Sequence, residues 1–395
     1  MLPHPFPSDP TTRHFRMRFF ACNSILAKSL AAMLLLFALS SCGDAGEYGT
    51  GDDGNDGISG RADHGAGTII VASKSGDDVH FIDRESGQTL LVLPTGREPH
   101  EVEVSRDGRI AVVTNYGDRE AAGNTLSVYD VLDGTLVRTI DLGEHTRPHG
   151  LWWMGDSDRV LVTTEGNRTL LVVDAVRGEV VRALNTEQDI SHMVAATPDL
   201  TRAFVPSIRT GKVTVFDLES GELLAQVYSG AGAEGIDVHP EGHEVWVTNR
   251  ADNTIAIIDT ESLEVLDTIV SEDFPIRGKF TPDGRYFLVS NARSGDIGVF
   301  DTADRELVAS ITLTPPVPEG VDETRYFSEF EGSSIPIGLV VPDNGTAYVA
   351  NTRSDAVSII DLETMTIAGH YPSGREPDGI NFSPLRPLPG EVRQE

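Results

Sequence analysis

The sequence has few cysteines, few basic residues and no long apolar segment after its first 41 residues. Its 395 residues include 2 Cys, and 31 Lys+Arg stand against 61 Asp+Glu. Two cysteines cannot form a disulfide framework. A net charge of −30 without a basic block repels phosphate backbones and anionic lipid head groups. We therefore expect a globular protein with a large core that does not bind nucleic acid.

The amino terminus has the features of a targeting segment. Basic residues precede an apolar stretch over residues 30–39, which is too short to span a bilayer. The stretch ends in Leu39-Ser40-Ser41-Cys42, which resembles the bacterial lipobox, in which the cysteine takes up diacylglycerol. We predict a lipoprotein signal peptide over residues 1–41 and lipidation of Cys42. The alternative is an ordinary signal peptide cleaved near Ser41, and Met17 is a second candidate start.

The segment that follows the predicted cleavage site is rich in glycine and acidic residues. Residues 43–67 contain almost nothing apolar, so they cannot bury enough surface to offset their ordering entropy. We predict an acidic, flexible tether over residues 42–67.

From Thr68 onward, short β-branched runs alternate with turn residues and repeat. Two apolar residues and an aspartate recur at successive spacings of 47, 44, 43, 42, 42 and 60 residues. This period is typical of the four-stranded blades of a propeller. Each aspartate precedes a short polar turn and is expected to cap a hairpin. The seven aspartates are Asp83, Asp130, Asp174, Asp217, Asp259, Asp301 and Asp361.

A second repeated pattern links each turn to an asparagine nine residues later. It ends in strands such as Val247-Thr248-Asn249 and Tyr348-Val349-Ala350-Asn351, which resemble the YVTN repeat. The resemblance implies a bacterial or archaeal envelope protein with seven blades, related to a group that includes lactone hydrolases. We therefore predict an all-β, seven-bladed propeller over residues 68–384, followed by a tail over residues 385–395.

The two ends of the predicted propeller carry related sequences. Gly96-Arg97-Glu98-Pro99-His100 near the start is echoed by Gly374-Arg375-Glu376-Pro377-Asp378 near the finish. Three strands between about Thr68 and Leu93 lack an inner partner. Pairing them with the last strand would complete the first blade and remove exposed strand edges.

The first residues of the inner strands are expected to meet at one end of the central channel. Six residues before each turn, five consecutive blades carry a titratable group: Asp378, His100, His149, His192 and Glu234. Ile276 and Pro336 complete the ring, with Arg277 as the alternative to Ile276 if the strand shifts by one residue. Three imidazoles and two carboxylates suit a divalent metal or acid–base chemistry. The alternative is a hydrogen-bonded lining of a water-filled channel.

Loops on the same face carry many of the cations of this acidic chain. They would suit an anionic ligand through charge-assisted hydrogen bonds. Acidic residues occupy the same loops, so pairing among neighbours is the alternative. The expected ligand rim consists of Lys74, Arg97, Arg147, Arg209, Arg250, Arg293 and Arg353.

The 60-residue unit is 18 residues longer than its 42-residue neighbours. A connection of this length inside a compact repeat is typical of a lid or binding loop. Tyr326, Phe327 and Phe330 lie in it, and we expect it beside Pro336 on the His-bearing face. The alternative is a surface excursion packed on its own blade.

No nucleophile elbow, phosphate-binding loop or dinucleotide fingerprint is present. We predict a monomeric, lipid-anchored propeller of the bacterial cell envelope that acts as a ligand-binding or protein-interaction scaffold. One alternative is a lactone hydrolase or isomerase that uses His149, His192, Glu234 and Arg277, by resemblance to the propeller lactonases. The other is a metal-binding protein that uses the His cluster.

Overall fold

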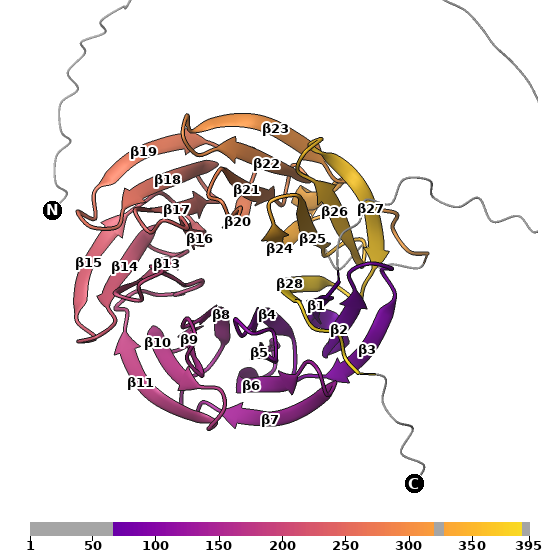
Figure 1. Ribbon diagram of the computed structural model, residues 1–395. Helices are drawn as coiled ribbons and strands as arrows, with labels where there is room; N and C mark the ends of the chain where they lie inside the picture. The colour runs from indigo at the N-terminus through magenta and orange to yellow at the C-terminus, as the bar shows by residue number, and fades with distance from the viewer. Residues whose placement is uncertain (1–65, 320–327, 389–395) are drawn as a thin grey trace, which may run out of the picture. The chain divides into compact units, whose positions relative to one another are not determined.

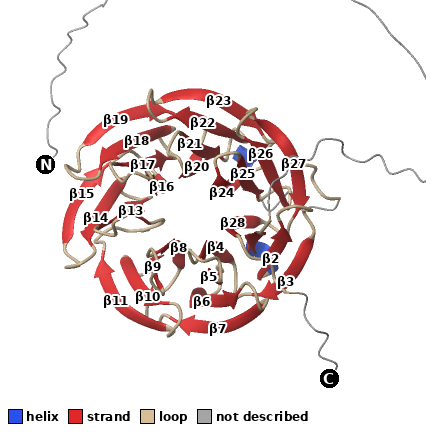
Figure 2. Cartoon of the chain, viewed as in Figure 1, coloured by secondary structure: helices blue, strands red, loops and turns tan. Residues whose placement is uncertain are grey.

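The computed structural model describes residues 66–319 and 328–388. They form seven four-stranded antiparallel sheets, arranged as blades around a central axis (Figure 1). Helical structure in the described part of the chain is limited to two short 3-10 turns, η1 (Lys74–Gly76) and η3 (Ser328–Phe330), as Figure 2 illustrates. The predicted all-β, seven-bladed propeller is confirmed. The predicted signal peptide, Cys42 and nearly all of the tether lie outside the described residues.

Blades 1 to 4 are described first. The strands of each blade are given in order from the axis outward. Blade 1 consists of β28 (Pro377–Ser383), β1 (Thr68–Ser73), β2 (Asp78–Asp83) and β3 (Thr89–Pro94). Blade 2 consists of β4 (Pro99–Val104), β5 (Ile110–Gly117), β6 (Ala122–Asp130) and β7 (Thr135–Asp141). Blade 3 consists of β8 (Pro148–Trp153), β9 (Arg159–Thr164), β10 (Thr169–Asp174) and β11 (Glu179–Asn185). Blade 4 consists of β12 (Ala195–Ala196), β13 (Arg202–Ser207), β14 (Lys212–Asp217) and β15 (Leu223–Tyr228).

The remaining three blades follow the same order. Blade 5 consists of β16 (Ala233–Val238), β17 (Glu244–Asn249), β18 (Thr254–Asp259) and β19 (Val265–Val270). Blade 6 consists of β20 (Pro275–Phe280), β21 (Tyr286–Asn291), β22 (Asp296–Asp301) and β23 (Glu306–Thr312). Blade 7 consists of β24 (Pro336–Asp343), β25 (Thr346–Asn351), β26 (Ala356–Asp361) and β27 (Thr366–Pro372).

The predicted ring closure is confirmed. β28 pairs antiparallel with β1, so that Thr68 lies opposite Ser383 and Ser73 lies opposite Pro377. The last strand therefore supplies the inner strand of blade 1, and blade 1 has the same four-strand order as the other six.

The seven repeated aspartates have the predicted structural role. Each carboxylate accepts a hydrogen bond from a backbone N–H two or three residues further along, in the turn between the third and fourth strands. Typical pairs are Glu85 N to Asp83 at 3.1 Å, Asp133 N to Asp130 at 2.8 Å and Ser262 N to Asp259 at 2.6 Å. The other four aspartates, Asp174, Asp217, Asp301 and Asp361, accept in the same way.

The core consists of apolar layers between neighbouring blades. Between blades 1 and 2, for example, Ile70, Phe81, Val102 and Tyr129 form one buried cluster. The Phe81 and Tyr129 rings meet edge to face at 6.2 Å between centroids. Each fully buried side chain of this size contributes about 1.5–3 kcal/mol, so the interfaces between blades supply most of the stability.

The chain after β28 stays against the propeller for a few residues. Leu385 packs on the cluster between blades 1 and 2, and the Arg386 side chain pairs with Asp83 at 2.6 Å. The Leu388 N–H donates to Leu132 O at 2.8 Å. The described part of the expected tail is thus attached to blades 1 and 2.

No helix in the ranges that the structure describes has the length and apolar composition that a membrane span requires.

Truncation before Pro377 should remove the inner strand of blade 1. It would expose the edge of β1 and remove Ile380, which packs with Ile69 and Val71. We therefore expect aggregation or a melting temperature lower by at least about 10 °C, because such losses cost several kcal/mol. Truncation after Leu388 is the control and should melt like the full chain. Equal melting of the two truncated chains in differential scanning calorimetry would contradict this closure.

Candidate functional site at the channel mouth

The inner strands begin at one end of the central channel, which we call the mouth. The structure brings the five predicted titratable residues together there in a row. His100 Nδ1 lies 3.0 Å from Asp378 Oδ2. The His100 and His149 rings are 4.8 Å apart between centroids, and the His149 and His192 rings are 3.7 Å apart. His192 Nε2 lies 3.2 Å from Glu234 Oε1.

A β-bulge at the start of the inner strands positions these side chains. In β4 the pairing with β5 shifts between Pro99 and Val102. The Glu101 N–H donates to Thr114 Oγ1 at 3.0 Å in place of a ladder carbonyl. Strands β8, β16 and β20 repeat the shift and the hydroxyl acceptor. Because a bulge interrupts the alternation of side chains, His100 and Glu101 both reach the channel.

Glycines beside the mouth allow neighbouring inner strands to approach closely. A Cβ atom on Gly379 would lie 2.3 Å from His100 O, and one on Gly150 would lie 2.6 Å from Met193 Cα. A side chain at either position would push apart the strands that carry Asp378, His100 and His149.

His192 lies between two carboxylates. Its Nδ1 lies 2.5 Å from Glu165 Oε1, and Glu165 Oε2 accepts the Tyr116 hydroxyl at 2.5 Å. Burial alone would lower the pKa of His192, but Glu234 and Glu165 outweigh it and raise this pKa. Burial opposes ionisation of Glu234, yet His192 and Arg250 lower its pKa to about 2. This half of the mouth holds an imidazolium between two carboxylates.

The other two imidazoles are neutral. Burial lowers the pKa of His100 despite the nearby Asp378, and burial together with His192 and His100 holds the pKa of His149 well below its usual value. His100 therefore donates Nδ1–H to Asp378. His100 Nε2 and His149 Nδ1 are buried and make no hydrogen bond within the described residues. His192 Nε2 also makes no hydrogen bond but lies 3.2 Å from Glu234 Oε1. His100 Nε2 and His149 Nδ1 are thus the two buried ring nitrogens of the cluster with neither a hydrogen bond nor an ion pair among the described residues.

A buried ion-pair network lies next to the cluster in the channel. The Arg277 guanidinium donates to Glu101 Oε1 at 2.7 Å and to Glu234 Oε1 at 3.1 Å. Ile276 instead packs with Ala292 and Ile335. The expected alternative, in which Arg277 replaces Ile276 at the mouth as a hook for anions, is therefore corrected: two carboxylates already engage the guanidinium.

Most of the expected ligand rim is paired with neighbouring groups. Arg97 pairs with Asp118 at 2.8 Å, Arg250 with Glu234 at 2.6 Å and Arg293 with Asp273 at 2.9 Å. Arg209 lies 3.8 Å from Asp189. Arg147 donates to Asp118 O and packs over the Tyr116 ring, while Arg353 donates to Phe330 O.

Lys74 differs from the other rim residues. It lies in η1, and its charge contributes to lowering the pKa values of Asp378 and His100. Within the described ranges, the side chains of Lys74 and Arg375 form no ion pair. Unpaired cations therefore lie on the Asp378 side of the mouth.

Part of the expected lid is described. Phe330 ends η3, packs on the buried cluster of Ile276, Ala292 and Ile335, and meets the Phe274 ring at 5.4 Å. It thus extends the apolar arc that Ile276 and Pro336 were expected to form. Tyr326 and Phe327 lie outside the described residues.

Sequence reasoning did not single out Tyr116, Glu165 and Glu101 as site residues. Tyr116 and Glu165 each follow a buried polar residue at or near the end of a second strand, Asn115 two residues before the end of β5 and Thr164 at the end of β9. Lys74 and Arg250 occupy the same position in other blades. Comparing this position between units would have identified a second ring of residues around the mouth. The sequence did not identify Glu101, because in a regular strand the side chains of His100 and Glu101 would point to opposite faces.

The cluster has the donor set of a metal site. One ligand atom each from His149, Glu165 and His192 lies within 4.8 Å of the others. A second group, His239, Glu241 and His243, is less suitable because both ring nitrogens of His239 are engaged, with Gly284 O and with Glu241 N–H. Free imidazole nitrogens at the mouth can bind a metal ion or the metal of a larger ligand.

Comparison with protein families gives one partial match. A family model described as the Cytochrome D1 heme domain matches residues 154–273. Two curated relatives are each called Protein NirF. The one from Stutzerimonas stutzeri is 24% identical over 201 residues, which are 48% of this chain and 51% of the relative. The one from Pseudomonas aeruginosa is 23% identical over 232 residues, which are 55% of this chain and 58% of the relative.

The chain therefore spans about half the length of the curated relatives that it matches. The sequence likeness is to the cytochrome d1 heme domain family, and the YVTN-repeat resemblance remains a prediction.

Solved structures with the same arrangement show the fold. A functionally unknown protein from Desulfotomaculum acetoxidans has a TM-score of 0.66 at 14% identity, covering 81% of this chain and 99% of that one. Hydrazine synthase from Kuenenia stuttgartiensis has a TM-score of 0.59 at 18% identity, covering 78% and 99%. Dihydro-heme d1 dehydrogenase NirN in complex with DHE has a TM-score of 0.57 at 15% identity, covering 80% and 74%.

The neutral imidazoles predict how stability depends on pH. Below the usual histidine pKa of 6.5, His149 binds a proton in the unfolded chain but not in the folded one. The free energy of unfolding should therefore fall by about 1.4 kcal/mol per pH unit per such histidine as the pH drops from 6.5. His192 has a raised pKa, so its contribution is complete below 6.5 and is lost only as the pH rises through its folded pKa.

Urea unfolding between pH 6.5 and pH 5 measures this effect. His149→Gln should have a shallower slope than the parent, and His243→Gln, altered at an exposed position in the turn between β16 and β17, is the control. Parallel slopes for the parent and His149→Gln would contradict a neutral His149.

Proposed function

We propose that this protein is a cell-envelope binding propeller whose mouth holds an iron tetrapyrrole of the d1-heme type. The observation that carries the proposal is the unpartnered Nε2 of His100, with Nδ1 of the same ring 3.0 Å from Asp378. The names of the matched family and of NirN support the ligand class. The matched range, 154–273, contains His192 and Glu234 but not His100, so the choice of ligand residue rests on this chain alone.

His100 is the residue that would bind the iron of such a group. A metal-binding histidine generally donates its other ring N–H to a carboxylate or carbonyl, which fixes the tautomer and orients the ring. Asp378 occupies that position, and its pKa of about 2 keeps it ionised although burial opposes this. The lowered pKa of His100 leaves its Nε2 lone pair available at neutral pH. His149 offers a second neutral nitrogen next to it.

The surroundings of His100 suit a flat, anionic macrocycle. Tetrapyrroles carry carboxylates, and Lys74 and Arg375 are cations without an ion-pair partner near the Asp378 side. Ile276 and Phe330 supply apolar contact on the opposite arc. The Tyr116 ring lies 4.4 Å from that of His100, so a ligand that reaches Nε2 displaces Tyr116.

A bound heme would supply a redox-active iron. The chain's own groups would orient the ligand and supply protons. His192, protonated between Glu165 and Glu234, holds a proton close to His149. Arg277 balances the charge of Glu234 and Glu101, which keeps these carboxylates ionised without a ligand.

The localisation is part of the same proposal. The lipobox-like sequence at Cys42 supports attachment to the envelope membrane, with a monomeric propeller on the tether.

Ferric protoporphyrin IX serves as a probe of the mouth. We expect the full chain to bind it with a shifted Soret band. Asp378→Asn should weaken binding about tenfold and His100→Ala by more, because the carboxylate partner of a metal-binding histidine is worth about 10–100-fold in metal affinity. His370→Ala, on outer strand β27, is the matched control and should bind like the parent.

Zinc alone separates the competing explanations. If the chain binds zinc tightly through His149 and gives no Soret shift with ferric protoporphyrin IX, the mouth is a simple metal site and does not bind a tetrapyrrole. If the chain binds neither zinc nor the porphyrin, the scaffold function remains. An unchanged Soret shift in His100→Ala would disprove His100 as the iron ligand.

Lipidation is tested by Cys42→Ser in a bacterial host. We expect the protein to move from the detergent-extracted membrane fraction to the soluble fraction, since an acylated cysteine supplies the membrane affinity. Cys22→Ser is the control and should leave the fractionation unchanged. Continued membrane association of Cys42→Ser would disprove the anchor.

A further inference from the structure

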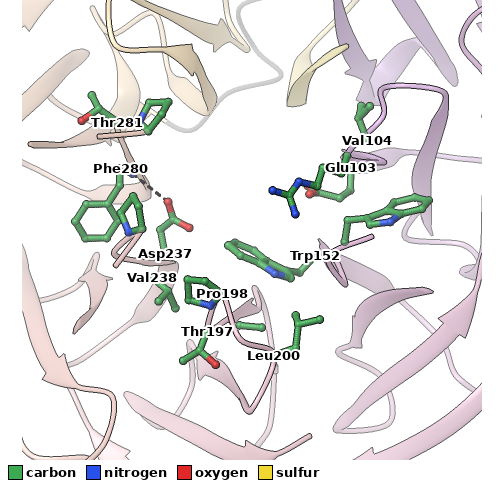
Figure 3. Close-up of a pocket in the computed structure, with 16 residues that line it drawn as sticks. Glu103, Val104, Trp152, Thr197, Pro198, Leu200, Asp237, Val238, Phe280 and Thr281 are labelled. Carbon is green, nitrogen blue, oxygen red and sulfur yellow. Dashed lines mark hydrogen bonds between the residues drawn. The ribbon is translucent and has the colours of Figure 1, made fainter. Parts of the chain in front are cut away.

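A cavity opens at the end of the channel opposite the mouth. Its volume is about 480 Å³, within the range of small-molecule sites. The walls include the aromatic and proline side chains of Trp152, Trp153, Pro198 and Phe280. Figure 3 shows that Trp152, Asp237 and Glu103 project toward the same space. They come from blades 3, 5 and 2, so the cavity lies between the inner strands of several blades.

Two carboxylates line this cavity, and one of them faces a cation. Asp237 Oδ2 accepts the Phe280 N–H at 3.0 Å, and Asp237 Oδ1 lies 3.6 Å from Lys279 Nζ. Glu103 accepts Asn381 Nδ2 at 2.9 Å. In the described part of the chain no cationic group lies within ion-pair distance of Glu103. The charged side chains that line the cavity are thus Glu103, Asp237 and Arg106, of which Glu103 has no ion-pair partner among the described residues.

An internal cation already occupies part of this environment. Lys279 Nζ lies 5.1 Å from the centroid of the Trp152 ring, a cation–π distance, while it also faces Asp237. The structure thus places an ammonium between an indole and a carboxylate at the point where the channel meets the cavity.

We propose that this cavity binds a small organic cation with an apolar body, of the primary or quaternary ammonium class. The cationic head would contact Asp237 and the Trp152 ring, where Lys279 supplies an ammonium now. The apolar body would contact Phe280 and Pro198. Arg106 at the cavity is turned to solvent and pairs with Asp156 at 3.3 Å. The proposal does not depend on the tetrapyrrole at the mouth, because the two sites lie at opposite ends of the channel.

The electrostatics of the carboxylates support a cationic ligand. Burial raises the pKa of Glu103 to about 7, with Lys279 opposing the rise and with Asp237 and Glu101 adding to it. Burial likewise raises the pKa of Asp237. A cation bound beside them would favour the ionised form of both carboxylates.

Calorimetric titration of the full chain with benzyltrimethylammonium tests the proposal, with benzyl alcohol as the neutral aromatic comparison. Asp237→Asn keeps an oxygen for the Phe280 N–H and should weaken binding about tenfold. Lys279→Met removes the competing ammonium and should strengthen binding about tenfold. Glu306→Gln, on the outer strand β23, is the control for loss of one negative charge and should leave binding unchanged.

Three results would overturn the proposal. They are no heat of binding with the parent and Lys279→Met, equal affinity for benzyl alcohol, or unchanged affinity in Asp237→Asn. Circular dichroism of each variant checks that the propeller remains folded.

Discussion

The geometry of the mouth depends on buried polar side chains at or near the ends of the second strands. Asn249 Nδ2 donates to Ser229 O at 3.1 Å, and the Ser229 hydroxyl donates to Asn249 Oδ1 at 3.0 Å. Asn115 holds Gly96 N–H, and Asn291 and Asn351 hold Ser271 and Ser334. In each case the bond fixes the loop that leads into an inner strand. Because these side chains are fully buried and paired, breaking one leaves unsatisfied polar groups and releases the strand start that carries a mouth residue.

The repeated parts of this architecture could be predicted from the sequence. The seven aspartates, the closing strand and the row from Asp378 to Glu234 all follow from spacing, because each unit places equivalent residues at equivalent positions. What could not be predicted lies where a unit departs from regular strand geometry. The bulge brings Glu101 into the channel and lets Ile276 and Arg277 both face inward at different depths. The regular alternation of side chains along a strand does not predict where a bulge occurs.

The sequence indicated charge pairing in the rim as an alternative but did not identify the partners. The arginines after the second strands looked like a cationic rim, yet carboxylates about 20 residues earlier in the chain neutralise several of them, as Asp273 does for Arg293. The imidazoles show the same dependence on context. Three neighbouring histidines of one chemical type divide into one charged and two neutral rings, because only His192 has a carboxylate at each nitrogen. The sequence shows which titratable side chains are present, whereas burial and neighbouring charges determine their protonation.

The closing strand has a further consequence for how the molecule can be held. Thr68 lies opposite Ser383, at the end of the inner strand that starts with Pro377 at the mouth. The first and last strands of the propeller therefore meet the adjoining chain on the side away from the mouth. A reporter inserted directly before Thr68 would therefore lie on the face that holds the Trp152 cavity and leave the histidine cluster accessible to a large binding partner.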